Sequence, residues 1–222
     1  MTNSVACRWI GFWGIALYLL ILLEIPFYFV YTPTPAGTPP PSIVLIRILI
    51  DLFVCLGLFA FFSGLKHILS ERFPEYNWLN TFILATGIAF PVVALIADSI
   101  QAGSVWALGE KPVNPTWVGF GAEGALLIYG PVNRILTATI LISCGTLIMK
   151  THFLPRWTAW LAFIISIYNL AFIPTMFFVT TPLDFYSVNG WNIPIAAGYF
   201  FLWVFIISII LLRRAGKMVN GE

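Results

Sequence analysis

Long apolar stretches, separated by short polar or proline-rich segments, dominate the order of residues along the chain. About 20 residues of helix cross a hydrocarbon layer roughly 30 Å thick, and each stretch reaches that length. Strands are not expected, because open sheet edges leave backbone groups unsatisfied in lipid. The pattern predicts an all-α membrane protein, a single six-transmembrane-helix bundle over residues 1–222. The predicted spans are about 9–31, 43–66, 79–99, 122–149, 154–180 and 191–213.

Composition supports a membrane protein over a soluble one. The chain has 222 residues, of which 60% are hydrophobic and 9% charged, and its mean hydropathy is +0.94. A soluble domain carries about 25% charged residues. The lipid bilayer is therefore the expected partner. A net charge of +2 gives no reason to expect nucleic acid binding.

Positive charges predict the orientation of the bundle. In a six-span arrangement only Lys111 falls in a loop on the side away from the termini. Eight basic residues fall on the other side: Arg8, Lys66, Arg72, Lys150, Arg156, Arg213, Arg214 and Lys217. Lys and Arg concentrate in cytoplasmic loops. We therefore expect both termini in the cytoplasm of a multi-pass protein of the bacterial cell membrane.

Five of the six spans carry a strong polar residue at nearly the same distance from their predicted cytoplasmic end. These residues lie 14 or 15 positions from that end, and they are Glu24, Asp51, Arg134, Asn169 and Tyr199. At 1.5 Å per residue this depth is roughly 22 Å. Polar groups at such depth rarely face lipid. The spacing predicts one polar layer inside the bundle, in its outer third.

Spacing also predicts how the charged groups pair. Arg47 and Asp51 are spaced i,i+4 on one helix face and can form an ion pair. Arg134 has no such neighbour, so we expect a carboxylate from another helix, either Glu24 or Asp51, to pair with it. Asp98 lies near the outer mouth of the third span. The candidate residues of an outward-facing ligand or proton pocket are thus Glu24, Arg47, Asp51, Asp98, Arg134, Asn169 and Tyr199.

Prolines and glycines add expectations about packing. Prolines fall in or near the outer half of five spans, at Pro26, Pro91, Pro131, Pro174 and Pro194. Kinks at these positions would spread the helices and open a cavity beside the polar layer. Small residues, such as Gly57 and Gly64, are expected to pack helices within one chain. Gly121 and Ala125 form a similar pair.

Two interpretations of the polar layer stay open. Its two arginines and three carboxylates sum to a charge of −1. Such a nearly neutral network can be structural and join helices inside the bundle. Alternatively, it forms a site for a small ligand or ion, or for a proton, with Glu24 as the first candidate for the proton-carrying group.

The leading functional hypothesis is non-enzymatic: binding, sensing or passage of a small ligand or ion. The alternative is a non-catalytic accessory subunit that packs against other membrane subunits. An intramembrane enzyme ranks third, because no HExxH or GxSxG motif is present. No metal or cofactor is expected. His67 and His152 lie at helix ends, where they cannot face each other as haem ligands.

One local motif has a familiar form. Residues 150–161 read KTHFLPRWTAWL and connect the fourth and fifth spans, and Arg47-Ile-Leu-Ile-Asp51 lies in the second. The first segment resembles the F-L-P-R-W-x-x-W-L turn of a bacterial six-helix membrane family catalogued only as a domain of unknown function. Members usually have glycine where this chain has Thr158 or Ala159. The resemblance implies a six-helix fold but no established activity, so it assigns no catalytic residue.

The charge distribution makes a direct prediction about topology. In a variant without the three native cysteines, a cysteine at Thr34 or Lys111 should react in intact cells with a membrane-impermeant thiol reagent. A cysteine at Glu71 should react only after the cells are opened, because it is expected on the cytoplasmic side. The reverse labelling pattern would invert the orientation.

Overall fold

The computed structural model describes residues 3–29, 41–108, 127–177, 185–188 and 190–220. Within these ranges six helices are long and apolar enough to cross a membrane. The described residues contain no strand. The predicted fold class, an all-α six-helix membrane bundle, is confirmed, and the chain is a multi-pass membrane protein.

The helices follow one another with short connections where the chain is described. Their bounds are α1 Asn3–Phe29, α2 Pro41–Arg72, α3 Asn77–Leu108, α5 Asn133–Thr151, α6 Arg156–Ala171 and α7 Asn192–Asn220. Three short elements accompany them, namely η1 Pro74–Tyr76, η2 Ile128–Val132 and η3 Ile173–Phe177.

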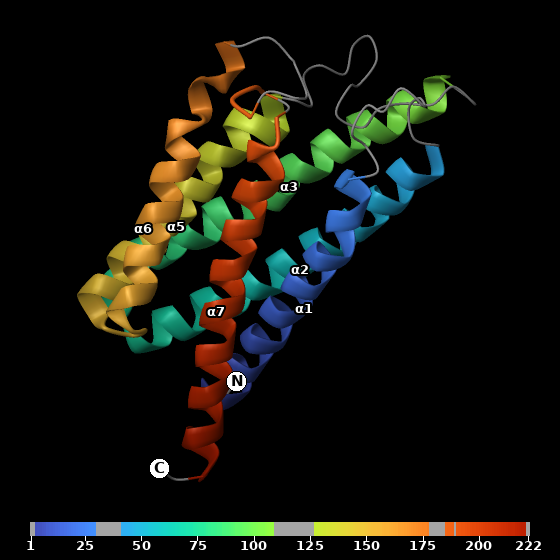
Figure 1. Ribbon diagram of the computed structural model, residues 1–222. Helices are drawn as coiled ribbons and strands as arrows, with labels where there is room; N and C mark the ends of the chain where they lie inside the picture. The colour runs from blue at the N-terminus through green and yellow to red at the C-terminus, as the bar shows by residue number, and fades with distance from the viewer. Residues whose placement is uncertain (1–2, 30–40, 109–126, 178–184, 189, 221–222) are drawn as a thin grey trace.

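The six long helices form a ring in which each packs against its neighbours in the sequence. The chain passes from α1 through α2, α3, α5 and α6 to α7, and α7 packs back against α1. Both termini lie at the same end of the bundle (Figure 1). An even number of spans requires this, but the side of the membrane on which that end lies stays a prediction.

Large apolar side chains fill the bundle and also cover its outside. Phe61, Phe200 and Trp203 are almost completely buried. Trp203 also donates a hydrogen bond from its indole N–H to the Thr158 carbonyl oxygen, at 2.9 Å, which joins α7 to α6. Ile167 is 66% exposed in the isolated chain. Lipid, and not water, is the solvent that makes such an exposed apolar surface stable.

Glycines allow the helices to approach closely within the chain. A Cβ at Gly57 would lie 2.8 Å from Leu17, and one at Gly64 would lie 2.8 Å from Ile10. Both contacts join α2 to α1, which confirms the expected intramolecular packing at these two positions. The other predicted pair, Gly121 and Ala125, lies outside the described residues.

Several predicted helix bounds were wrong. α1 begins earlier than predicted, at Asn3, and α7 continues to Asn220. α2 continues to Arg72 through a charged segment predicted to be a connection, and His67 there lies 3.3 Å from Glu71 one turn later. Because a polar helix end can extend beyond the hydrocarbon layer, hydropathy alone placed the end too early. Similarly, α3 runs to Leu108 through residues predicted to be loop. In contrast, α6 ends at Ala171, and η3 with Pro174 follows, because proline disfavours helix in the preceding residue.

The start of the fourth span has an irregular backbone that matters for the site. η2 is a π-helix, and Gly130 within it has φ −82° and ψ −108°. Pro131 lacks an amide hydrogen, which interrupts the regular hydrogen-bond pattern at this turn. The backbone N–H of Asn133 donates to the carbonyl oxygens of both Gly130 and Ile128. A widened turn changes which faces the preceding and following side chains occupy.

The tight packing of α3 against α2 can be tested at one glycine. A Cβ at Gly87 would lie 2.6 Å from Cδ1 of the buried Phe62, whereas one at Gly103 in the same helix would meet nothing within 4 Å. Gly87→Ala should therefore lower the free energy of unfolding by about 1–3 kcal/mol through overpacking. Gly103→Ala is the matched control and should have little effect. Unfolding in detergent, followed by tryptophan fluorescence, measures both, and equal effects would contradict the packing.

Candidate functional site

Arg47 on α2 holds three carboxyl groups together from three helices. Its Nη1 lies 3.8 Å from Oε1 of Glu24 on α1 and 3.5 Å from Oδ2 of Asp51, one turn along α2. Its Nη2 lies 3.9 Å from Oδ1 of Asp98 on α3 and donates a hydrogen bond to the Gln101 side-chain oxygen. The predicted ion pair between Arg47 and Asp51 is confirmed.

Tyr129, in η2, extends this cluster to the fourth span. Its hydroxyl donates a hydrogen bond to Oδ1 of Asp98. The Arg47 guanidinium carbon also lies 5.7 Å from the centre of the Tyr129 ring, within reach of a cation–π contact. One arginine thus connects α1, α2, α3 and η2 at a single level of the bundle.

Arg134, the second residue of α5, has a different environment. It is buried, as predicted, and only 2% of its surface is exposed. Its Nη2 donates a hydrogen bond to Oδ1 of Asn192 at the start of α7, and its guanidinium carbon lies 5.3 Å from the centre of the Phe172 ring. Its Nε and Nη1 have no hydrogen-bond partner among the described residues.

The predicted pairing of Arg134 with Glu24 or Asp51 was wrong. Neither carboxylate lies within 4.0 Å of Arg134, while both lie within that distance of Arg47. The reason is geometric. Arg47 shares a helix face with Asp51 and packs directly toward α1, whereas Arg134 approaches from the opposite side of the bundle. The shared depth of Glu24, Asp51 and Arg134 did not show that both carboxyl groups contact Arg47.

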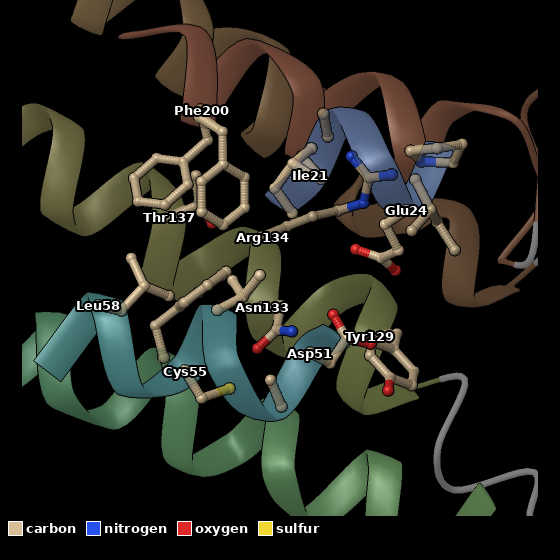
Figure 2. Close-up of a pocket in the computed structure, with 18 of the residues that line it drawn as sticks. Ile21, Glu24, Asp51, Cys55, Leu58, Tyr129, Asn133, Arg134, Thr137 and Phe200 are labelled. Atoms are coloured by element: carbon tan, nitrogen blue, oxygen red, sulfur yellow. The ribbon is translucent and has the colours of Figure 1, made fainter. Parts of the chain in front are cut away.

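A cavity of about 100 Å³ separates the Arg134 side from the acidic side. Its polar wall includes Glu24, Asp51, Asn133, Arg134 and Asn169, and apolar residues of α1, α2, α3 and α7 complete it. Figure 2 shows Arg134 extending across this space toward the part of α1 that carries Glu24. The same view shows Asp51, Asn133 and Tyr129 on the other side. The cavity lies in the half of the bundle away from the termini, because its α1 and α7 residues come from the end of α1 and the start of α7.

Several polar atoms around this space lack a hydrogen-bond partner among the described residues. Besides Nε and Nη1 of Arg134 they include Oδ1 of Asn133. Buried polar groups are satisfied by protein, water or a ligand in more than nine cases out of ten. An unsatisfied guanidinium is costly to bury, so these atoms favour a hydrogen-bonding occupant of the cavity.

The candidate residues divide into three groups. Glu24, Asp51, Arg134 and Asn169 line the cavity. Arg47 and Asp98 do not line the cavity. Arg47 forms ion pairs with Asp51, which does, and with Asp98. Tyr199 lies elsewhere: it is 45% exposed on the outer face of α7. Its ring contacts that of Tyr168, with 5.6 Å between the two centres. Its depth matches the layer, but it faces outward.

Sequence reasoning missed Tyr129 as a member of the site. Tyrosines near membrane interfaces are common, so its residue type carried no signal. The Gly130-Pro131 pair was the available indication, because it places a widened turn between Tyr129 and Arg134. Through that turn Tyr129 contacts the acidic cluster, while Arg134 contacts Asn192.

Charge counting describes what the arrangement can do. With every group ionised, Arg47, Arg134, Glu24, Asp51 and Asp98 sum to −1, because two positive charges meet three negative ones. Low-dielectric surroundings make an uncompensated charge costly. The excess negative charge lies on the Arg47 side, where three carboxyl groups meet one cation, whereas none of these carboxyl groups lies within 4.0 Å of Arg134. Among the described residues, no three His, Cys, Asp or Glu side chains are grouped so as to hold a metal ion.

No protein-family model matches the chain, and neither does any curated protein or solved structure. Membership of the six-helix family that the FLPRW turn resembles therefore stays a prediction. The turn itself is well defined. His152 ends α5 in the left-handed conformation, with φ 54°, and Pro155 is the residue before α6.

The two arginines should respond differently to removal of their charge. Arg47→Met leaves three clustered carboxyl groups without a cation and should cost about 3–5 kcal/mol of stability. Arg134→Met removes one charge-assisted hydrogen bond but also an unpaired buried charge, so its cost should be about 1–2 kcal/mol or less. Unfolding of the purified protein in detergent measures both. A larger cost for Arg134→Met would mean that Arg134 is a structural ion-pair partner.

Proposed function

We propose that this membrane protein binds a small ligand or ion in the cavity between Arg134 and the acidic cluster. The observation that carries the proposal is the buried Arg134 guanidinium, whose Nε and Nη1 lack partners among the described residues. A guanidinium is the preferred protein group for carboxylate and other oxyanions. The ligand group that contacts Arg134 is therefore proposed to be an anion.

The size of the cavity limits that group. A volume of about 100 Å³ is below the roughly 300–1,000 Å³ of a pocket for a drug-sized ligand. It corresponds to about three water molecules at their liquid volume. An anion of a few heavy atoms, such as a carboxylate group, suits this space.

The carboxyl groups opposite Arg134 would make the site selective for the charge of the anion. Glu24 and Asp51 face the same cavity as Arg134, and both contact Arg47. A large or multiply charged anion would be repelled by these carboxyl groups, whereas a monovalent one can lie against Arg134 with less opposition. The proposed role is non-enzymatic, and the pocket is proposed to face outward, consistent with the orientation predicted from the basic residues.

The accessory-subunit hypothesis has one observation in its favour. The Arg47 cluster joins α1, α2 and α3 by ion pairs, which is the arrangement expected of a structural network. The same cluster does not explain the free donors of Arg134. For that reason we place ligand binding first.

A thermal-shift titration of the purified protein tests the proposal. Sodium acetate, compared with sodium chloride at equal ionic strength, should raise the melting temperature with saturation. Ligand binding to the folded state contributes about 2.7 kcal/mol at 100 times its dissociation constant. Arg134→Met should abolish the acetate response.

Arg156→Met is the matched control. It removes the same charge as Arg134→Met, but from an exposed residue at the start of α6. This variant should respond to acetate like the wild type. An equal response of the wild type and Arg134→Met would contradict ligand binding at Arg134. Copurification of other membrane proteins with the intact chain would then support the accessory-subunit hypothesis.

A further inference from the structure

A second hollow, of about 500 Å³, lies on the outside of the bundle between α1 and α7. Its walls are mostly apolar and include Ile21, Ile25, Pro194 and Gly198, with Tyr199 at its side. We call it the α1–α7 groove. Tyr199 lies at the depth of the polar layer but lines this outer groove and not the cavity inside the bundle.

The groove results from the way the two helices diverge. Near the termini they are in tight contact, because a Cβ on Gly14 would collide with the Ser208 side chain. Toward the other end they separate, as Figure 1 shows for the blue and red helices. Nothing lies within 4 Å of a Cβ built on Gly198, so the α7 wall of the groove is open at this position.

The groove and the cavity behind it share a wall. Ile21, Ile25 and Pro194 line both. The Arg134 guanidinium lies behind this wall, because it donates a hydrogen bond to Asn192 on α7 and extends toward Glu24 on α1 (Figure 2). An apolar groove thus adjoins a small cavity lined by an arginine whose Nε and Nη1 lack a hydrogen-bond partner among the described residues.

We propose that the ligand is a long-chain carboxylic acid, whose carboxyl group contacts Arg134 and whose hydrocarbon chain occupies the α1–α7 groove. This inference rests on the proposed function and names its ligand class. The smaller cavity suits a carboxyl group, and the larger groove suits an apolar chain. Access is sideways from the bilayer, between α1 and α7.

Charge favours a carboxylic acid over other anionic amphiphiles. A carboxylic acid can enter from the bilayer in its neutral form, whereas a sulfate or phosphate ester stays charged. Neutral entry avoids the cost of moving an ion through hydrocarbon toward Glu24 and Asp51. Once bound, the acid gives its proton to a carboxylate of the same cavity, Glu24 or Asp51, so the total charge of the site does not change. The carboxylate of the ligand then accepts hydrogen bonds from Nε and Nη1 of Arg134, which lack a partner among the described residues.

Photocrosslinking in lipid nanodiscs tests the inference, with a diazirine-labelled palmitic acid as the probe. Crosslinks should map to the segments of α1 and α7 that line the groove. Unlabelled palmitic acid should compete, whereas methyl palmitate, which has the same chain without the acid, should not. Arg134→Met should reduce specific crosslinking by about tenfold, as expected for loss of a charged hydrogen bond.

Gly198→Leu is the decisive variant. Leucine fills the groove without meeting another atom at Cβ, so the fold should be retained while crosslinking falls about tenfold. Gly216→Leu, in the same helix and also with open space at Cβ, is the matched control and should crosslink like the wild type. The melting temperature of each variant verifies folding.

The outcomes separate this inference from the proposed function. Undiminished crosslinking in Gly198→Leu, or equal competition by methyl palmitate, would overturn the long-chain ligand. An acetate response that still depends on Arg134 would in that case leave small-anion binding intact. Loss of the chain-dependent crosslink in Gly198→Leu, together with a retained acetate response, would support both proposals.

Discussion

Everything at the polar layer depends on how one guanidinium, that of Arg47, compensates charge where bulk water is absent. Three carboxyl groups from α1, α2 and α3 lie within 4 Å of it. In hydrocarbon surroundings each of these groups would be costly without a cation nearby. Their common partner therefore determines how the three helices meet at this depth. The Tyr129 hydroxyl on Asp98 adds the fourth span to the same cluster.

Because all three carboxyl groups contact Arg47, Arg134 has a different environment. Both arginines are only 2% exposed, yet one contacts three carboxylates and the other contacts an amide, Asn192. Residue type and burial are the same, so the difference arises from position and direction within the bundle. An arginine whose charge is not compensated by described carboxylates is poorly suited to a purely structural task. It is well suited to an anionic ligand that supplies the missing partner.

The sequence predicted the fold well, because apolar runs of transmembrane length leave few alternatives in a bilayer. It also predicted the depth of the layer, and Glu24, Asp51, Arg134 and Asn169 do line one cavity. It did not predict which groups face one another, because that depends on rotation about each helix axis. Tyr199 lies at the predicted depth but on the outer face of its helix. Tyr129 reaches the acidic cluster because of the irregular turn at Gly130 and Pro131.

The helices α1 and α7 are in close contact at one end and diverge at the other. Near the termini, Gly11 and Gly14 permit such close contact with Leu212 and Ser208 that any larger side chain would collide. That contact fixes the two helices as a unit and contributes to stability. Away from the termini, the same helices diverge around Pro194, and the space between them adjoins Arg134. A lateral opening can exist at this end because the other end is closed. The close contacts and the open space thus lie at different ends of one helix pair, so the proposed entry of a ligand would not disturb the contacts that hold the bundle together.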